Sequence, residues 1–271
     1  MRKSKDIKEF RNYQNVEVNI KNNYLLARRN QTVDYVQKMY LKYLTFDMKL
    51  TFDDIFQHLE QFVDVSDPDI SLPNFYHGIQ TAEAIRKDGL PDWLQLIGLI
   101  HDIGKIMFLK GCDEDGTSVK NQWGIVGDTF IVGCKIPDTV VYPEFNNENP
   151  DMKNSKTNTR LGIYKENCGL KNVMCSWGHD EFLYQILKYN PNTLPKEALY
   201  IVRYHSLYPY HTEGEYEYFM DEDDEKMLTW VKLFNKYDLY TKTNNKKIEE
   251  EVITYYKTLI EKYFYNQELF F

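Results

Sequence analysis

One histidine–aspartate pair, His101-Asp102, lies in the most apolar stretch of the sequence, residues 93–103. His101 follows Leu94 and Ile97 at the spacing i, i+3, i+7, so it lies on the inward face of a predicted helix. A buried imidazole beside a carboxylate costs free energy unless a partner satisfies both groups. A metal ion is such a partner, because neutral histidine is a common ligand and a carboxylate supplies compensating charge. The pair therefore indicates a candidate metal site.

Two further helices present a potential ligand in the same way. His205 and Asp238 each end an i, i+3, i+7 stripe, which begins with Ala198 and Ile201 in the first case and with Val231 and Phe234 in the second. A single histidine on an apolar face is more often a core residue bonded to a carbonyl than a ligand. A carboxylate on such a face is rarer, since carboxylates are seldom fully buried without a partner. Three such positions on three helices favour a metal centre.

The other four histidines give weaker signals. His77 and His179 each stand at the start of a predicted helix, where a metal ligand and an ordinary helix-starting polar residue are both consistent with the sequence. We interpret His58 as a solvated helix position, and His211 as a loop residue near the site but not in it.

The elements that must position these residues are predominantly helical. Apolar periodicity predicts helices over 33–65, 77–87 (closed by Gly89), from Pro91 through Ile100, and over 179–189, 195–206, 222–240 and 247–264. Residues 111–160 are rich in Gly, Asn, Asp and Thr, so we expect loops there, with a short hairpin or loops near 120–145. No Pro/Gly/Ser-rich linker divides the chain. We predict a mostly α fold and a single domain over 1–271, with 1–30 as an N-terminal arm.

Composition limits the classes of function and location. The chain has 271 residues, a net charge of −8 and 15% aromatic residues. An acidic chain without a basic tract lacks the phosphate-neutralising charge of a nucleic-acid or anionic-membrane binder, and the aromatic content argues against disorder. The apolar stretch at 93–103 is too short to span a bilayer, and residues 1–10 lack a signal-peptide pattern. The four cysteines form no CxxC pair, so we expect reduced thiols and a cytoplasmic protein.

Longer motifs carry a resemblance to a known family. The order His77, His101-Asp102, Asp238 resembles the HD-domain superfamily of helical metalloenzymes. Five stretches are more specific and together resemble the myo-inositol oxygenase family: residues 64–69, 123–130, 176–181, 204–209 and 234–242. The similarity extends from Phe10 nearly to the C-terminus. The loop at 110–121 looks longer than in animal members and the tail before Phe10 looks shorter, which puts lid shape and tail packing in doubt.

The resemblance implies an HD-domain-like helical bundle that holds two iron ions in a mixed-valent Fe(II)/Fe(III) form. Such an enzyme cleaves the ring of myo-inositol with O₂ to give D-glucuronate, and family members are expected to be monomers. Carried onto this sequence, one iron would be bound by His77, His101, Asp102 and Asp238. The other would be bound by Asp102, His179 and His205, with Asp102 as the bridge. These six ligands mix nitrogen and oxygen donors, as iron accepts.

The resemblance also implies a set of catalytic and substrate-binding residues. Lys105, four residues after His101, would stabilise an inositol alkoxide, and Asp102 would act with it as the second catalytic residue. The substrate contacts implied by the family motifs are Arg11, Asp64, Ser66, Lys105, Gly127, Asp128, His205, Ser206 and Lys242, with Tyr24 as a further candidate. Read without the family, the alternative for Gly127 is a simple turn, and the alternative for Lys105, Lys242 and Arg11 is a solvated surface charge.

Two other classes of function stay open at the sequence level. An HD-type metal-dependent phosphohydrolase would share His77, His101, Asp102 and Asp238, but it would need several Arg or Lys side chains around its phosphate. The motif neighbourhood here mixes Asp, Ser and Lys, which suits a polyol better. A non-enzymatic iron-binding or polyol-sensing module would bind the same groups and consume no O₂.

Overall fold

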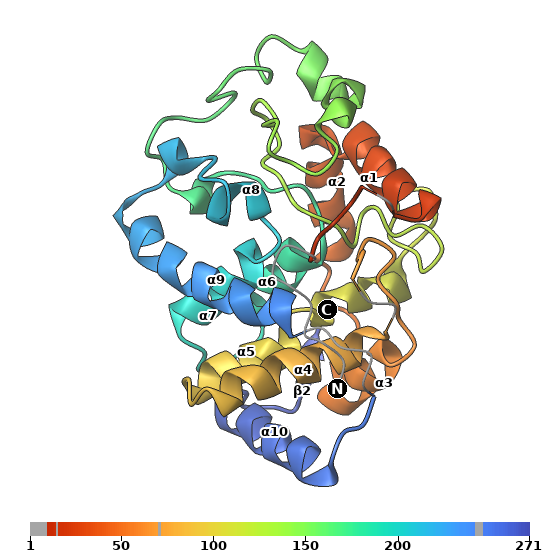
Figure 1. Cartoon of the computed structure of the whole chain (residues 1–271), viewed down its shortest axis with the longest axis vertical. Helices are drawn as coiled ribbons and strands as arrows, with labels where there is room; N and C mark the ends of the chain where they lie inside the picture. The colour runs from red at the N-terminus through yellow and green to blue at the C-terminus, as the bar shows by residue number, and fades with distance from the viewer. Residues whose placement is uncertain (1–9, 15, 70–71, 242–245) are drawn as a thin grey trace.

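The computed structural model describes residues 10–14, 16–69, 72–241 and 246–271, and it is predominantly helical (Figure 1). The mostly α prediction is confirmed. The helices are α1 (Val18–Asn30), α2 (Val33–Tyr43), α3 (Phe52–Leu59), α4 (Asn74–Lys87), α5 (Asp92–Ile100), α6 (His179–Tyr189), α7 (Lys196–Tyr204), α8 (Tyr208–His211), α9 (Glu222–Tyr240) and α10 (Glu250–Tyr263). Short 3-10 helices add η2 (Ile103–Lys110), η3 (Pro143–Glu148), η4 (Pro150–Lys153), η5 (Leu170–Asn172) and η6 (Glu217–Phe219).

The prediction of one helical segment over 33–65 is wrong in its middle and at its end. The chain leaves α2 at Leu44 and forms strand β1 (Lys49–Thr51) before α3 begins. Thr51 starts α3 with a capping box, in which its side chain and that of Asp54 each accept from the other's main-chain N–H. Between Leu44 and Phe52 apolar residues alternate with polar ones, which is the period of a strand, so the prediction of a continuous helical pattern overlooked a local signal.

Strand β1 pairs with a strand from the other end of the sequence. It runs antiparallel to β2 (Glu268–Phe270), with Leu50 opposite Leu269. The described part of the chain contains no other sheet. The short hairpin considered near 120–145 is absent there, and turns and 3-10 segments take its place, as the loop prediction allowed. An isolated bridge between Ile131 and Cys175 ties this region to the segment before α6.

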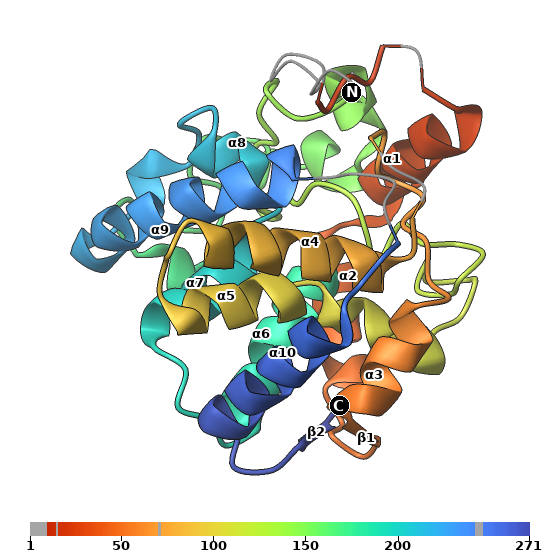
Figure 2. The same ribbon diagram turned by 60° about the horizontal axis from the view of Figure 1, so that its bottom comes forward.

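Helices α4 and α5 form the tightest pair and lie side by side in both ribbon views (Figures 1 and 2). Two glycines permit this approach. A Cβ added to Gly78 would lie 2.6 Å from the Leu99 carbonyl oxygen, and one added to Gly98 would lie 2.8 Å from Ala82 Cα. Helix α9 packs on α4, α5 and α7, and α6 packs on α7 and η2. The buried faces of these helices share one hydrophobic core.

The helices that carry candidate ligands lie close to their predicted positions. The predictions 179–189 and 222–240 match α6 and α9 residue for residue. The prediction 77–87 starts three residues late, because α4 begins at Asn74, directly after Pro73. Helix α7 ends at Tyr204 and α10 spans 250–263, each a few residues shorter than predicted.

None of the helices in the described ranges is both long and apolar enough to cross a lipid bilayer.

Candidate metal centre

Four buried histidines converge from four different helices. His77 lies in the first turn of α4, and His179 is the first residue of α6. His101 and His205 directly follow the last residues of α5 and α7. All four imidazoles are buried. Because each sits near a helix end, side chains from separate helices can meet at one point in the core.

In three of these imidazoles the Nδ1 atom donates to a main-chain carbonyl. The pairs are His101 with Gly98, His179 with Ile125 and His205 with Val202, at 3.0, 2.7 and 2.9 Å respectively. A ring that carries its proton on Nδ1 presents a bare Nε2, which is the form that binds a metal ion. The local fold therefore prepares these three Nε2 atoms as ligands.

Asp238 joins His77 and His101 in a first cluster that could hold a metal ion. Its Oδ1 lies 2.8 Å from His77 Nε2 and 3.4 Å from His101 Nε2. Burial acts to raise the pKa of Asp238, but its contacts with His101 and His77 hold this pKa well below its usual value. The carboxylate is thus ionised and available as an anionic ligand.

Asp102 faces both this cluster and a second group of imidazoles. Its Oδ1 lies 3.0 Å from His179 Nε2 and 3.7 Å from His205 Nε2. Its Oδ2 lies 3.6 Å from His101 Nε2. Burial opposes ionisation, but Lys105 and the surrounding histidines hold the pKa of Asp102 well below its usual value. One ionised carboxylate therefore presents a different oxygen to each half of the site.

The second group of imidazoles is arranged to attract positive charge. The Nε2 atoms of His179 and His205 lie only 3.2 Å apart, although both Nδ1 atoms already donate elsewhere. Two bare nitrogens at this distance repel unless a proton or a metal ion lies between them. Burial acts to lower the pKa of His205, but the carboxylates of Asp180 and Asp102 raise it to about 9. A donor set of four imidazoles and two carboxylates with this charge preference fits metal ions.

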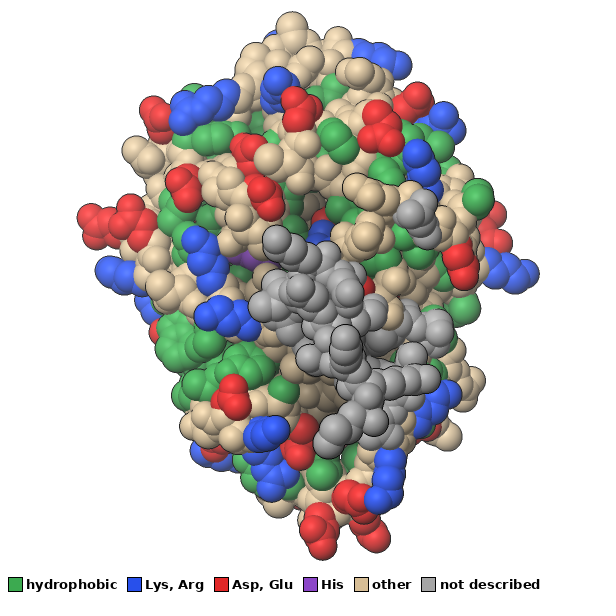
Figure 3. Space-filling view, in the orientation of Figure 1, with side chains coloured by type: hydrophobic (Ala, Val, Ile, Leu, Met, Phe, Trp, Pro, Cys, Tyr) green, Lys and Arg blue, Asp and Glu red, His purple; other side chains and the backbone are tan. Residues whose placement is uncertain are grey.

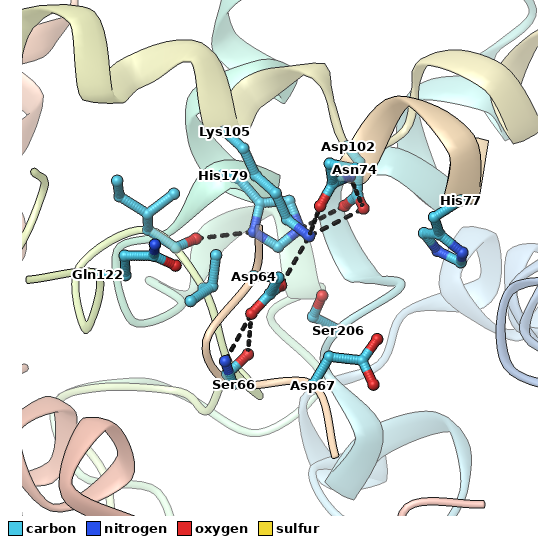
Figure 4. Close-up of polar contacts among 12 residues, drawn as sticks. Asp64, Ser66, Asp67, Asn74, His77, Asp102, Lys105, Gln122, His179 and Ser206 are labelled. Carbon is cyan, nitrogen blue, oxygen red and sulfur yellow. Dashed lines mark hydrogen bonds and ion pairs between the residues drawn. The ribbon is translucent and has the colours of Figure 1, made fainter. Parts of the chain in front are cut away.

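Lys105 lies at the edge of the metal centre and is fully engaged (Figure 4). Its Nζ donates to Asp64 Oδ2 at 2.8 Å, to Asn74 Oδ1 at 2.9 Å and to Asp102 Oδ2 at 2.9 Å. Burial alone would lower the pKa of Lys105, but Asp102 and Asp64 raise it well above its usual value. The alternative of a solvated surface charge is therefore wrong for Lys105. Its side chain points into the site from the 3-10 helix η2, not from a continuation of α5.

One cavity is lined by all the predicted site residues that the structure describes. They are Arg11, Tyr24, Asp64, Ser66, His77, His101, Asp102, Lys105, Gly127, Asp128, His179, His205, Ser206 and Asp238. Lys242 lies outside the described residues. In the space-filling view, a histidine and side chains of both charge signs are visible at a hollow near the centre of one face (Figure 3). The lining is thus polar, with donors and acceptors close together.

The N-terminal segment contributes Arg11 to this cavity. Its guanidinium forms an ion pair with Asp128 and stacks on the Tyr208 ring, 3.5 Å from the ring centroid. Tyr24 OH also donates to Asp128, at 3.2 Å. The guanidinium is largely buried, so the solvated-charge alternative is wrong for Arg11 as well. Gly127, beside Asp128, has a φ of +103°, a conformation that favours glycine, as the alternative of a simple turn requires. The same residue also lines the cavity.

Comparison with known proteins identifies the family of this chain. A family model described as myo-inositol oxygenase matches residues 17–271. The chain belongs to the myo-inositol oxygenase family. Inositol oxygenase from Danio rerio is 44% identical over 264 residues, which cover 96% of this chain and 92% of that protein. Inositol oxygenases from Dictyostelium discoideum and Mus musculus are each 44% identical, covering 97% of this chain and 90% of the relative.

Sequence reasoning missed several residues that line or support the site of this myo-inositol oxygenase family member, and three of them have defined contacts with predicted site residues. Asn74 bonds both Asp102 and Lys105, and Tyr208 stacks on Arg11. Asp180 is buried 3.2 Å from His179 Nε2 and accepts from Ser206 Oγ at 3.0 Å. Asp180 was detectable, since it adjoins His179. Asn74 and Tyr208 carry no charge or periodic signal that marks them in the sequence.

The two remaining histidines lie apart from the metal-ligand cluster of this family member. His211 is buried in α8, not in a loop, and its Nε2 contacts the main-chain oxygen of His205 at 2.8 Å. It is near the site but not in it, as predicted. Burial lowers the pKa of His211 to about 3, so this imidazole is neutral. His58 is half-buried on α3, where its ring meets Phe108 edge-on.

Proposed function

We propose that this chain cleaves the ring of myo-inositol with O₂ to give D-glucuronate, at a centre of two iron ions. The observation that carries the proposal is the position of Asp102 between two groups of imidazoles, in a chain of the myo-inositol oxygenase family. The names of the relatives, inositol oxygenase, support the same substrate.

The proposed ligand sets follow the two groups. His77, His101, Asp238 and Asp102 would hold one iron, and His179, His205 and Asp102 would hold the other. Asp102 would bridge through its two oxygens, each of which faces one group. Mixed imidazole and carboxylate ligation suits iron, and few carboxylates leave coordination positions free. We propose the mixed-valent Fe(II)/Fe(III) state as the working form.

When bound, the iron ions supply Lewis acidity toward inositol hydroxyls and the redox chemistry with O₂. Lys105 holds its proton firmly, so the charge of its ammonium can stabilise a substrate alkoxide without titrating. A direct hydrogen bond to the alkoxide would replace one of its three present acceptors. Asp64 stays ionised, because Lys105 lowers its pKa against the effect of burial. Its carboxylate can accept a hydrogen bond from a substrate hydroxyl and fix the ring beside Lys105.

A neutral polyol must be positioned by hydrogen bonds alone, since it has no charged handle. Ser66 and Ser206 offer hydroxyls, and Asp128 and Arg11 offer an acceptor and a donor. We propose these four residues, with Gly127, His205 and Tyr24, as substrate contacts. Lys242 remains a proposed contact on the family resemblance.

The charge around the cavity does not favour the phosphohydrolase alternative. The Arg and Lys side chains of its lining, among the described residues, are paired with carboxylates: Arg11 with Asp128, and Lys105 with Asp64 and Asp102. Asp67 and Asp69 line the same cavity. Among the described residues, the lining therefore offers a phosphate no Arg or Lys that is free of a carboxylate partner, whereas a neutral polyol finds many acceptors.

We further propose an HD-domain-like single domain with 1–30 as its arm, acting as a cytoplasmic monomer. The four cysteines are free thiols, which suits a reducing compartment, and the net charge of −8 suits a protein without nucleic-acid or membrane partners. Light scattering of the purified protein tests the monomer.

The decisive experiment is an oxygen-electrode trace with anaerobically loaded Fe(II), a reductant and myo-inositol. We expect inositol-dependent O₂ uptake with one D-glucuronate formed per O₂. Phosphate release from nucleotides without O₂ uptake would overturn the oxygenase. Metal and inositol binding without any turnover would instead indicate a non-enzymatic binding module.

A further inference from the structure

Asn74, the first residue of α4, is a buried amide between two charged groups of the site (Figure 4). Its Nδ2 donates to Asp102 Oδ2 at 2.6 Å, and its Oδ1 accepts from Lys105 Nζ at 2.9 Å. Only one orientation of the amide serves both neighbours, because an ionised carboxylate only accepts and an ammonium only donates. The hydrogen-bonding network therefore defines the conformation of this side chain.

The main chain also fixes the position of Asn74. Its N–H donates to the Phe62 carbonyl at 2.8 Å, and the preceding Pro73 forms a bridge with Val63. Asn74 thus connects the start of α4, which carries His77, to the turn after α5, which carries Asp102. This connection is a side-chain contact between two elements that each supply metal ligands.

The bond from Asn74 restrains the rotation of the Asp102 carboxylate. The terminal torsion of an aspartate is broad, so a carboxylate without donors can turn its plane. Asn74 and Lys105 both donate to Oδ2. This pair of bonds leaves Oδ1 turned toward His179 and His205.

The amide also suits the local charge. Asp64 and Asp102 contribute two negative charges around the single ammonium of Lys105. A cation at position 74 would repel metal ions, and a carboxylate there would repel Asp102. A neutral amide donates to one neighbour and accepts from the other without changing the net charge.

We propose that Asn74 is a positioning residue that sets the orientation of Asp102 toward both metal positions and holds Lys105 beside it. The assignment rests on the proposed function, because it requires two metal ions that share Asp102. Asn74 need not contact the substrate. Outer contacts of this kind typically account for roughly 10–100-fold in metal affinity or activity.

Two substitutions at position 74 separate the donor from the acceptor. Asn74→Asp keeps the size and the acceptor for Lys105, but it replaces the donor to Asp102 with a carboxylate that repels Asp102. Asn74→Ala loses both. The control is Asn190→Ala, because Asn190 is an equally buried amide whose Nδ2 bonds the carbonyls of Ile186 and Phe270, away from the site.

The readouts are the anaerobic Fe(II) binding isotherm, the Mössbauer spectrum of the ⁵⁷Fe-loaded protein, and kcat and KM for myo-inositol. We expect both Asn74 variants to bind the second equivalent of iron at least about 10-fold more weakly, with altered coupling between the irons and a similar fall in kcat. Asn190→Ala should lose stability but keep normal iron binding. If Asn74→Ala does not fold, Asn74→Asp decides.

Wild-type-like iron affinity, spectrum and kcat in Asn74→Asp would overturn the donor role. If Asn190→Ala lost as much iron as the Asn74 variants, general destabilisation would explain the loss, and the assignment would be overturned. A wild-type protein that binds only one iron, or takes up no O₂ with inositol, would overturn the proposed function and this assignment with it. If the wild type binds two irons and takes up O₂ with inositol, and the Asn74 variants do the same at normal affinity and rate, this assignment alone would be overturned.

Discussion

The two oxygens of Asp102 have different neighbours, and this difference sets the roles of the residues around it. Oδ1 faces His179 and His205, whereas Oδ2 receives hydrogen bonds from Asn74 and Lys105 and faces His101. Asp238, in contrast, pairs with His77 and His101 and, among the described residues, with no other histidine. Removing one carboxylate or the other should therefore have different effects on metal content.

Asp102→Ala should lose both metal ions, or nearly so, because the two proposed groups of ligands share this carboxylate. Asp238→Ala should lose only the metal bound with His77 and His101. Metal analysis by mass spectrometry after anaerobic loading and gel filtration measures the two stoichiometries. An Asp102→Ala protein that keeps two irons and near-normal turnover would show that the carboxylate does not bridge.

Lys105→Ala should lower kcat/KM for inositol by about 10²-fold or more, the scale of removing one stabilising donor from an active site. Iron content should stay normal, because Asp102 keeps its hydrogen bond from Asn74. The substitution also removes an ammonium, whose positive charge repels metal ions. The matched control is Lys110→Ala, on the same 3-10 helix, where Lys110 pairs with the exposed Asp47. Equal activity of the two variants in the oxygen-electrode assay would contradict the role of Lys105.

At the scale of elements, the close packing of α4 on α5 brings His77 and His101 together. Gly98 has two roles here. Its missing Cβ admits the backbone of Ala82, and its carbonyl oxygen accepts the Nδ1 proton of His101. The helix interface and the orientation of a ligand therefore depend on the same residue.

Gly98→Ala should lower the free energy of unfolding by about 1–3 kcal/mol, the usual cost of overpacking, and should also reduce iron content. The control is Gly89→Ala, which meets no atom within 4 Å but forces alanine to a φ of +68°. That control should cost about 1–2 kcal/mol, the price of a left-handed residue, with full iron content. Urea unfolding and metal analysis on both variants test the difference, and unchanged iron in Gly98→Ala would refute the link.

At the scale of the whole molecule, the last residues of the chain complete the core. Phe271 is fully buried, and its main chain exchanges two hydrogen bonds with Met48 beside β1. Its ring lies 6.1 Å from that of Phe182 on α6, the helix that begins with His179. The C-terminal strand thus supports an element of the metal centre from behind.

Phe271→Ala should lower the free energy of unfolding by about 3–5 kcal/mol, because it leaves a cavity where a buried ring was. Phe270→Ala should cost less than about 1 kcal/mol, since that ring is 38% exposed. Both variants keep the main-chain pairing of β2. Thermal and urea unfolding compare them, and similar losses would show that the buried ring contributes little.

The sequence alone determined the features that depend on local periodicity. Residues at i, i+3 and i+7 share a helix face whatever the rest of the chain does, so His101, His205 and Asp238 were predictable as buried groups. The bounds of α6 and α9 followed for the same reason. The family motifs added His77 and His179, whose local pattern left ligand and helix start equally open.

Only the tertiary structure decided how these residues combine. The pairing of β1 with β2 depends on contacts between opposite ends of the sequence, which no local pattern encodes. The bare Nε2 atoms depend on carbonyls that face the rings, and for His179 that carbonyl belongs to the distant Ile125. Asn74 had no visible role because a neutral amide acquires one only when packing places it between a carboxylate and an ammonium.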